Sequence, residues 1–349
     1  MVAKIKIVIN DNSSINICSV RVYSYNIFHW FSELGYDVVL NDWNNYSKYD
    51  VVIFGKNTKL ESIKKAKAQN PKLLCGLIHP SDYSYERRRL FESADFFITD
   101  AILEKDYYLK YNPNIFIFPE IEKIFTKTKI HNDHKPIIIG YHGNLDHLKN
   151  FPLPLKSALE KLNKQIQIKL ITVYDVKKLG FWKKGRPDID VEHVQWGLDT
   201  IENSLLRCDI GIVPGLIPIS EKSKAFLFNI LKLIQRGARD QKNDYLLRFK
   251  NCTNAGRAFV FHQLGIPVVS DFMPHSFHIL SNSDCGYLAH SEQGWFLALK
   301  KLSESAELRQ KIAENALEEF NRFYNPLKWS ERLYQDVENL WQNTKNKNR

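Results

Sequence analysis

The chain has 349 residues, of which 44% are hydrophobic and 13% aromatic, and it carries a formal net charge of +10. These values provide ample apolar side chains for hydrophobic cores, and the length argues against a single domain. The positive charge favours anionic partners, namely nucleotide phosphates, an anionic membrane surface or nucleic acid, without choosing among them.

Five cysteines are scattered along the chain, without a CxxC pair or a histidine at metal-ligand spacing. An odd, unpatterned set of this kind predicts reduced thiols in a cytosolic protein. The first residues lack the apolar core of a signal peptide, and no apolar run is long enough to cross a membrane. We therefore expect a cytoplasmic protein, and peripheral association with the inner face of the membrane stays open.

Short apolar runs alternate with helical segments through the first third of the chain. The runs are apolar on both faces, as buried parallel strands are, and they cover residues 5–9, 38–40, 51–54, 73–78, 96–99 and 115–118. Helices are expected between them, for example over residues 60–69 and 101–110. The alternation predicts a parallel sheet with helices on both faces. No GxGxxG follows the first strand, so this is not a clean dinucleotide-binding fingerprint.

Polar residues follow the fourth of these strands, in the segment 77–89. His79 and Asp82 are expected to face, from the acceptor side, the cleft that two such domains form. His79 is the strongest candidate for a catalytic or sugar-contacting group, and a buried structural histidine is the alternative. Asp11 and Asn12 follow the first strand in the same way. A reaction that inverts the sugar's configuration needs a base, for which Asp11, Asp82 or His79 is available.

A second alternating series follows a polar, basic segment at residues 121–135, which is expected to link two domains. The strands of this series are expected at residues 137–141, 168–173, 191–195, 210–213 and 268–270, with a basic helical insertion at 216–250. Two helices separated by Pro326 close the chain. The predicted fold is α/β, with two Rossmann-like, doubly wound domains. Residues 1–123 plus 327–349 form the acceptor-side domain, and residues 136–326 form the donor domain.

The first strand of the second domain ends in a glycine turn, in the sequence IIIGYHGN at residues 137–144. Gly143 lets backbone N–H groups approach a phosphate at the carboxyl end of the sheet, and Lys149 follows within reach of the same anion. His142 is expected to project into the cleft as a further catalytic candidate. A capped turn with surface charge is the alternative.

The third strand of this series ends at Trp196 and Gly197, where a nucleotide base can stack or be bound by backbone groups. A purely structural tryptophan is the alternative. Asp199 or Thr200 can cap the following helix. Glu202 lies in the first turn of that helix and is assigned to the same donor site.

The segment 248–274, RFKNCTNAGRAFVFHQLGIPVVSDFMP, has the pattern of a helix start, an apolar helix, a glycine stop and a buried strand. Thr253 or Asn254 can cap this helix, whose small first-turn residues let a ligand approach the backbone. Lys250 and Arg257 flank that end with two positive charges. The pattern predicts a diphosphate site, and an ordinary buried helix–strand unit with surface charges is the alternative.

Two further features concern metals and membranes. Asp188 and Asp190 form a DxD sequence, but it precedes a strand, whereas a metal-binding DxD follows one, so we expect no metal ion and no cofactor. Residues 181–184 mix aromatic and basic side chains, which suits a membrane interface or a solvated loop with one packed tryptophan. The basic insertion either binds anionic headgroups or is a solvated helical pair.

The segment 248–274 resembles the donor half of GT-B glycosyltransferases, together with CDIGIVP before it and GYLAHSEQGWFLALKKL after it. The likeness is to the family 4 type and related bacterial polysaccharide enzymes. IGYHGNLDHLKNF resembles their first C-domain loop, and RFYNPLKWSERLYQDVENLW resembles the terminal helix that crosses back to the N-domain. The resemblance implies two domains facing a cleft and metal-independent transfer of a sugar from a nucleotide-diphosphate donor. It implies a glycan, lipid-linked or protein acceptor. A nucleic-acid-binding role would rest only on net charge, and no recognisable module supports it, so we expect no nucleic-acid partner.

The chain departs from the family pattern at several positions. The donor-phosphate arginine and lysine of the family correspond to Asn144 and Lys149, so Lys250 or Arg257 is expected to replace the arginine. The family's two glutamates correspond to Cys252 and Val260. Two alternatives follow: a nucleotide-sugar epimerase of the same fold, and a homologue that binds the donor without catalysis.

Overall fold

The computed structural model describes residues 5–79, 85–215, 255–281 and 284–347. The predicted basic insertion at 216–250 lies outside these residues, and so do the predicted site residues Asp82, Lys250, Thr253 and Asn254. The chain divides into two compact units. Unit 1 consists of Met1–Lys123 and Tyr324–Arg349, and unit 2 is Ile124–Phe323.

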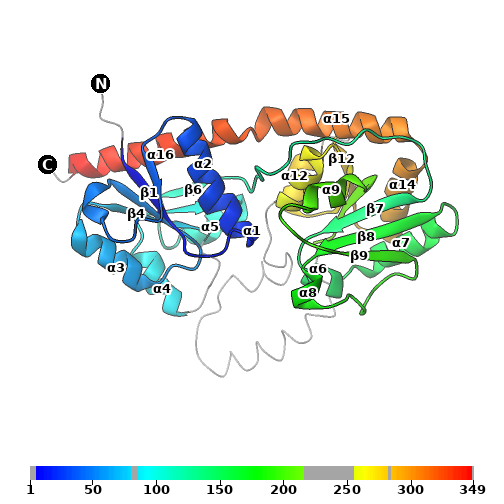
Figure 1. Cartoon of the computed structure of the whole chain (residues 1–349), viewed down its shortest axis with the longest axis horizontal. Coiled ribbons are helices and arrows are strands. Elements are labelled where there is room, and N and C mark those ends of the chain that lie inside the picture. The colour runs from blue at the N-terminus through cyan, green and yellow to red at the C-terminus, as the bar shows by residue number, and fades with distance from the viewer. Residues whose placement is uncertain (1–4, 80–84, 216–254, 282–283, 348–349) are drawn as a thin grey trace. The chain divides into compact units, whose positions relative to one another are not determined.

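Unit 1 is built on a parallel sheet that has six strands within the described residues (Figure 1). They are β1 (Ile7–Asn10), β2 (Val38–Leu40), β3 (Val51–Phe54), β4 (Leu74–Ile78), β5 (Phe96–Thr99) and β6 (Ile115–Ile117). Their order across the sheet is β2-β1-β3-β4-β5-β6. β1, β3, β4 and β5 are buried at every position, which is why the sequence is apolar on both faces there. The predicted parallel sheet is confirmed.

Helices cover the sheet of unit 1. They are α1 (Cys18–Val20), a π-helical turn (Arg21–Tyr25), α2 (Asn26–Glu33), a 3-10 turn (Tyr46–Lys48), α3 (Leu60–Gln69), α4 (Tyr85–Glu92), α5 (Ile102–Tyr108) and α16 (Pro326–Lys347). α3, α4 and α5 share one hydrophobic cluster with the strands. The last helix, α16, packs against α2. Its Tyr334 ring stacks on Tyr36 with centroids 3.6 Å apart and meets Phe31 edge-on.

Unit 2 repeats this architecture with a different strand order (Figure 1). Its described strands are β7 (Ile137–His142), β8 (Ile168–Tyr174), β9 (Asp190–Gln195), β10 (Ile210–Val213), β11 (Val268–Asp271) and β12 (Gly286–Ala289). They are parallel and lie in the order β12-β11-β10-β7-β8-β9. The short edge strand β12 was not predicted, because GYLA is brief and begins with glycine.

Two hydrophobic clusters lie on the two faces of the second sheet. The described helices of unit 2 are α6 (Leu145–Lys149), α7 (Leu153–Asn163), α8 (Val176–Leu179), α9 (Ile201–Leu206), α12 (Gly256–Gln263), α13 (Pro274–Leu280), α14 (Glu292–Ser303) and α15 (Ala306–Phe323). Leu170 of β8 belongs to the cluster with α7 and α14, whereas its neighbour Ile171 belongs to the cluster with α9 and α12. This alternation is the period of two expected for a strand buried on both faces.

Much of the predicted polar linker is hydrogen-bonded to unit 2. Asp209 is fully buried and accepts hydrogen bonds from the backbone N–H of Ile138 at 2.8 Å and from His134 at 3.0 Å. The ammonium of Lys129 lies 3.3 Å from the same carboxylate. Buried Arg309 of α15 donates to the carbonyl oxygen of Asn132 at 2.9 Å. The segment is polar because its side chains bind unit 2 rather than only solvent.

The two C-terminal helices belong to different units. α15 ends at Phe323 in unit 2 and α16 begins at Pro326 in unit 1, so the predicted break at this proline is confirmed. None of the described helices combines the length and the apolar character that crossing a bilayer requires.

Candidate functional site

The strand order of unit 2 marks a position where a ligand is expected. From β7 the chain continues to β8 and β9 on one side of the sheet, and then crosses to β10 on the other. In open α/β sheets, ligands bind beyond the carboxyl ends of the strands at such a switch point. Gly143 follows β7, and Pro214 and Gly215 follow β10, so the predicted glycine turn lies at this position.

The side chain of Arg257 extends to these two strand ends. Its Nη1 donates a hydrogen bond to the carbonyl oxygen of Pro214 at 2.8 Å. A Cβ atom on Gly143 would lie 3.0 Å from Arg257 Cδ, and one on Gly215 would lie 3.4 Å from Arg257 Nη2. Gly143 also has a φ of +134°, which L side chains rarely adopt. Glycine at position 143 therefore leaves room for the stem of Arg257, whose guanidinium lies beside Pro214 and Gly215.

His142, the last residue of β7, holds the backbone of Arg257. Its Nε2 donates to the carbonyl oxygen of Arg257 at 2.9 Å, and its ring meets Phe261 edge-on at 5.0 Å. The imidazole is buried. Burial lowers the pKa of His142 to about 4, and the charge of Arg257 acts in the same direction. The neutral ring therefore positions α12, which differs from the predicted projection of this side chain into a cleft.

The start of α12 completes this corner of unit 2. The helix begins at Gly256 with Ala255 as the N-cap residue, immediately after the described chain resumes. The loop after β10 is fixed by Asp271, whose Oδ2 accepts a hydrogen bond from the backbone N–H of Gly215 at 2.5 Å. A Cβ on Gly215 would lie only 2.1 Å from Met273 Sδ, so this position also requires glycine. The positive end of the helix dipole and the Arg257 guanidinium thus belong to the same corner.

Asn144 and Lys149 lie just beyond β7. Asn144 is exposed, and its carbonyl oxygen accepts a hydrogen bond from the Tyr141 hydroxyl at 2.6 Å. Lys149 is the exposed last residue of α6. The phosphate contacts of both side chains stay predictions.

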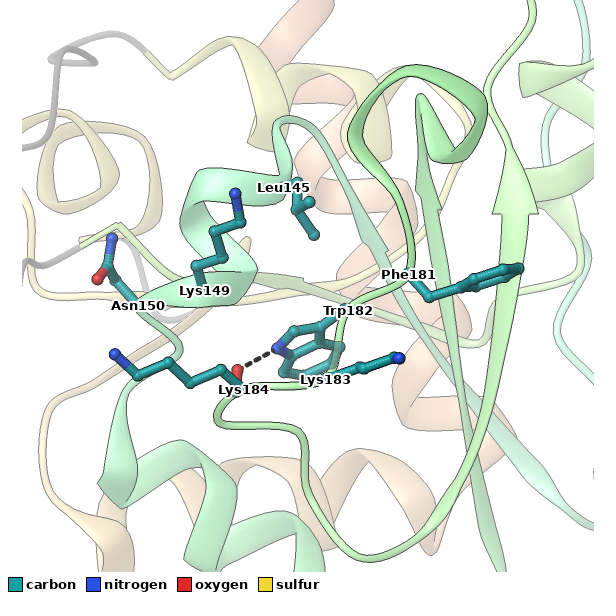
Figure 2. A pocket seen from close by; sticks show the side chains of 7 residues that line it. All are labelled: Leu145, Lys149, Asn150, Phe181, Trp182, Lys183 and Lys184. Carbon is teal, nitrogen blue, oxygen red and sulfur yellow. Dashed lines mark hydrogen bonds between the residues drawn. The ribbon is translucent and has the colours of Figure 1, made fainter.

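Lys149 lines a pocket of about 390 Å³. The pocket lies between α6 and the loop before β9, and its lining residues are Leu145, Lys149, Asn150, Phe181, Trp182, Lys183 and Lys184. Trp182 is buried and donates from Nε1 to the carbonyl oxygen of Lys184 at 2.7 Å, whereas Phe181 is 65% exposed. Figure 2 shows that the three ammonium groups point in different directions, so the pocket does not focus their charge on one point.

The predicted base-binding strand end is well ordered by backbone contacts. Trp196 is half-buried, packs against the cluster with α9 and α12, and donates from its backbone N–H to Tyr174 at 2.9 Å. Thr200 is the N-cap residue of α9, but its hydroxyl donates to the carbonyl oxygen of Gly197 instead of capping the helix. A Cβ on Gly197 would lie 2.9 Å from that hydroxyl oxygen.

Glu202 is engaged by the segment that precedes unit 2's first strand. Its carboxylate accepts hydrogen bonds from the backbone N–H groups of Thr126, at 2.5 Å, and Lys127, at 2.9 Å. These bonds lower the pKa of Glu202. The contacts give this predicted donor-site residue a structural role in holding the chain segment.

Polar residues also gather at the carboxyl ends of the strands of unit 1. His79 follows β4, Asp100 follows β5, and Glu104 lies in the first turn of α5. All three are buried. His79 Nδ1 lies 3.1 Å from Glu104 Oε2 and 3.8 Å from Asp100 Oδ2. The hydroxyl of Tyr23 donates to Asp100 Oδ2 at 2.7 Å, and its ring stacks on the imidazole of His79. We call His79, Asp100 and Glu104 the His79 cluster.

Charge controls the protonation of this cluster. Burial lowers the pKa of the His79 imidazole, but the carboxylates of Glu104 and Asp100 outweigh burial and raise it to about 9. Burial likewise raises the pKa of Glu104, so the proton in this 3.1 Å contact is held by the pair of side chains. Half-buried Glu120 follows β6, and burial, with the charge of Asp100 next, raises its pKa to about 7.

Sequence analysis identified His79 and Asp11 in unit 1 but missed Asp100, Glu104 and Glu120. The hydrogen-bond partners of Asp11 are outside the His79 cluster. Its carboxylate accepts hydrogen bonds from the hydroxyl of Ser24 and the backbone N–H of Ser13. The sequence does contain a pattern that indicates Asp100, because this residue directly follows the predicted strand 96–99 as His79 follows the predicted strand 73–78.

No family model matches the chain, and no curated relative matches it. Several solved structures match it along nearly its whole length. A glycosyltransferase from Rickettsia africae is 11% identical with a TM-score of 0.61, and the match covers 98% of each chain. Anabaena Alr3699/HepE, solved with UDP and glucose, is 12% identical with a TM-score of 0.57, over 96% of this chain and 100% of its own. A DNA-modifying β-glucosyltransferase, solved with and without uridine diphosphoglucose, is 14% identical with a TM-score of 0.58, over 95% and 99%.

These likenesses show the fold. The two parallel α/β units have the architecture of GT-B glycosyltransferases, which confirms the predicted fold class. At these identities the likeness does not extend to the reaction.

The buried neutral state of His142 makes the stability of unit 2 depend on pH. Its folded pKa of about 4 lies below the ordinary value of 6.5, so the unfolded chain takes up the proton first as pH falls. Stability is therefore complete above pH 6.5 and falls by about 1.4 kcal/mol per pH unit down to pH 4. His142→Gln keeps a donor for the Arg257 carbonyl and cannot titrate. Between pH 7 and pH 5 it should lose about 2 kcal/mol less than the wild type in urea unfolding.

Exposed His290 provides the control for this measurement. His290→Gln should keep the wild-type dependence of unfolding free energy on pH. An unchanged dependence in His142→Gln would show that His142 takes up a proton equally in the folded and unfolded protein.

Proposed function

We propose that the chain is a glycosyltransferase that moves a sugar from a nucleoside-diphosphate donor to an acceptor hydroxyl. The observation that carries this proposal is the position of Arg257. Its guanidinium lies at the switch point of the unit 2 sheet, beside Gly143 and the start of α12. A planar guanidinium, a glycine turn and a helix start together suit a diphosphate.

The chemistry of the leaving group explains why such a site serves transfer. As the glycosidic bond breaks, negative charge develops on the β-phosphate of the nucleotide. Arg257 and the helix dipole stabilise that charge without reorganising, so in this proposal the donor phosphates need no metal ion. Lys149, Lys250, Thr253 and Asn254 remain further proposed donor contacts.

We propose UDP as the nucleotide. HepE was solved with UDP and glucose, and the β-glucosyltransferase with uridine diphosphoglucose. The base is proposed to meet Trp196 and Gly197, because these residues end a strand at the carboxyl edge of the same sheet.

The carboxyl edge of unit 1 is proposed to receive the acceptor. His79 is proposed to orient the acceptor hydroxyl by donating a hydrogen bond from Nε2, because its Nδ1 faces the carboxylates of Glu104 and Asp100. Glu120 has a pKa of about 7, which suits a general base at neutral pH. We therefore assign to Glu120 the proton transfer that sequence analysis placed on His79 or Asp82.

The acceptor class is proposed to be a glycan, lipid-linked or protein hydroxyl. A positively charged surface suits an acceptor that carries phosphate, and exposed Phe181 beside Lys183 suits an anionic membrane interface. One neighbouring structure is that of a DNA-modifying enzyme, so modified DNA belongs in the acceptor panel as the competing outcome.

Arg257→Met tests the donor site. The substitution keeps much of the apolar stem beside Gly143 and removes the charge, so UDP affinity measured by calorimetry should fall about 10- to 100-fold. Arg207→Met removes the same charge from an exposed pair with Glu192 in the same unit and should leave affinity unchanged. Wild-type binding of UDP by Arg257→Met would refute the proposed donor site. Equal loss in both variants would indicate a net-charge effect.

Gly143→Ala tests the same site by steric means. The new Cβ meets the stem of Arg257 at 3.0 Å and the Tyr141 hydroxyl at 3.1 Å, so UDP affinity should fall about tenfold. Gly180→Ala is the matched control, because Gly180 also has positive φ, at +76°, but nothing lies within 4 Å of its Cβ position. Gly180→Ala carries the backbone strain without the steric contacts, so Gly143→Ala should lose at least as much stability in thermal unfolding. Equal UDP affinity in the two variants would show that Arg257 does not bind the nucleotide.

Glu120→Gln tests the proposed base. Because a base acts when unprotonated, the wild-type rate of UDP release from UDP-glucose should rise with pH through about 7. In the variant the rate should no longer rise with pH through about 7, and at pH 8 it should be about 100-fold lower than in the wild type. Glu33→Gln, which removes an exposed carboxylate paired with Lys123, should keep both. If Glu120→Gln keeps the rise of the rate with pH, a group other than Glu120 is the base.

A further inference from the structure

The His79 cluster has the composition and spacing of a metal site. One possible ligand atom from each of His79, Asp100 and Glu104 lies within 4.8 Å of the other two. Among the residues that the structure describes, these three form the one group of histidine, cysteine or acidic side chains that could hold a metal ion. The three side chains are buried, unlike the acidic clusters that are common on protein surfaces.

The distances can be compared with the edges of a coordination tetrahedron. Bonds of 2.0–2.1 Å from Zn²⁺ to nitrogen and carboxylate oxygen place neighbouring ligand atoms about 3.3–3.4 Å apart. The separations from His79 Nδ1 are 3.1 Å to Glu104 and 3.8 Å to Asp100, and all three ligand atoms lie within 4.8 Å of one another. The His79–Glu104 pair is close to this edge, and the Asp100 carboxylate has to move toward the other two ligand atoms to complete it.

The backbone already presents these side chains to one point. Asp100 directly precedes the N-cap residue of α5, and Glu104 lies in the first turn of that helix, so one short segment carries both carboxylates. His79 has a φ of +40°, an uncommon conformation for a residue other than glycine. Such backbone strain is often found at ligand-binding positions. It turns the imidazole toward the two carboxylates.

A supporting contact also fits a metal site. The Tyr23 hydroxyl donates to Asp100 Oδ2 at 2.7 Å, and hydrogen bonds of this kind orient metal-ligating carboxylates. The carboxylates of Asp100 and Glu104 face the His79 imidazole, and Glu120 adds negative charge that the Arg21 guanidinium partly balances. Buried groups of like charge are normally compensated by opposite charge or by a metal ion.

We propose that His79, Asp100 and Glu104 bind a divalent transition-metal ion, with Zn²⁺ as the ion that this ligand set fits best. One imidazole and two carboxylates leave a fourth position open, as in zinc sites that bind a water or substrate oxygen. The site lies on unit 1, whereas the proposed donor contacts lie on unit 2. It departs from the expectation of no metal, which rested on the DxD sequence. Exposed Asp190 lies near Lys169 and joins no metal-ligand group within the described residues.

Calorimetry with Zn²⁺ on the full chain tests this proposal, with Mn²⁺ and Mg²⁺ as comparison ions. The wild type should bind one equivalent of Zn²⁺, and Co²⁺ in its place should give visible absorption bands typical of low coordination number. Glu104→Gln, which is isosteric, should weaken Zn²⁺ binding at least about 100-fold. Glu92→Gln, in an exposed pair with Arg88, should bind like the wild type.

Two more variants keep the test decisive. Cys18→Ser removes an exposed thiol beside Glu120 that could hold Zn²⁺ itself, and it should keep the bound equivalent. If Glu104→Gln does not fold, Tyr23→Phe should still weaken binding about tenfold. The proposal is overturned if the wild type binds no stoichiometric Zn²⁺, or if binding is lost in Cys18→Ser and kept in Glu104→Gln or Tyr23→Phe. No donor or acceptor is present in this experiment, so its failure would leave the proposed sugar transfer intact.

Discussion

The hydrogen bond from Arg257 to the carbonyl oxygen of Pro214 joins the start of α12 to the end of β10. The same residue's carbonyl oxygen is held by His142 at the end of β7. One arginine thus links, through its two ends, the two strands between which the order of the sheet reverses. Each strand end carries a glycine whose missing side chain makes room for an arginine or a methionine. The two hydrogen bonds of Arg257 and the space left by the two glycines together shape the candidate donor site.

Charge is distributed differently over the two candidate sites. The corner of unit 2 offers a guanidinium and a helix start, with the nearby histidine kept neutral by burial. The carboxyl edge of unit 1 offers the carboxyl groups of Asp100, Glu104 and Glu120 beside the His79 imidazole. The corner of unit 2 suits a negatively charged ligand. The carboxyl edge of unit 1 suits a ligand that gives up a proton or binds through a cation.

Sequence patterns were sufficient for the fold and only partly for the sites. The buried strands are apolar at both parities, so their positions were predicted to within one or two residues, whereas brief β12 was missed. The sequence placed both Gly143 and Arg257 in the donor site. Gly143 follows β7, and Arg257 lies in the first turn of α12, and the structure brings the two residues together. Glu202 has a role that no local pattern reveals, because its partners Thr126 and Lys127 lie far away in sequence. Glu104 became a candidate only once α5 placed it beside Asp100.

The stacking of Tyr334 on Tyr36 has a consequence for the order in which the chain matures. Unit 1 begins before unit 2 in the chain, but its helix α16 comes from residues that are synthesised after unit 2. Unit 2 is one continuous segment and is complete before α16 exists. Domains generally fold as units while the chain emerges. The unit that begins first is therefore finished last, and until then the Phe31 and Tyr36 side chains lack the helix that covers them.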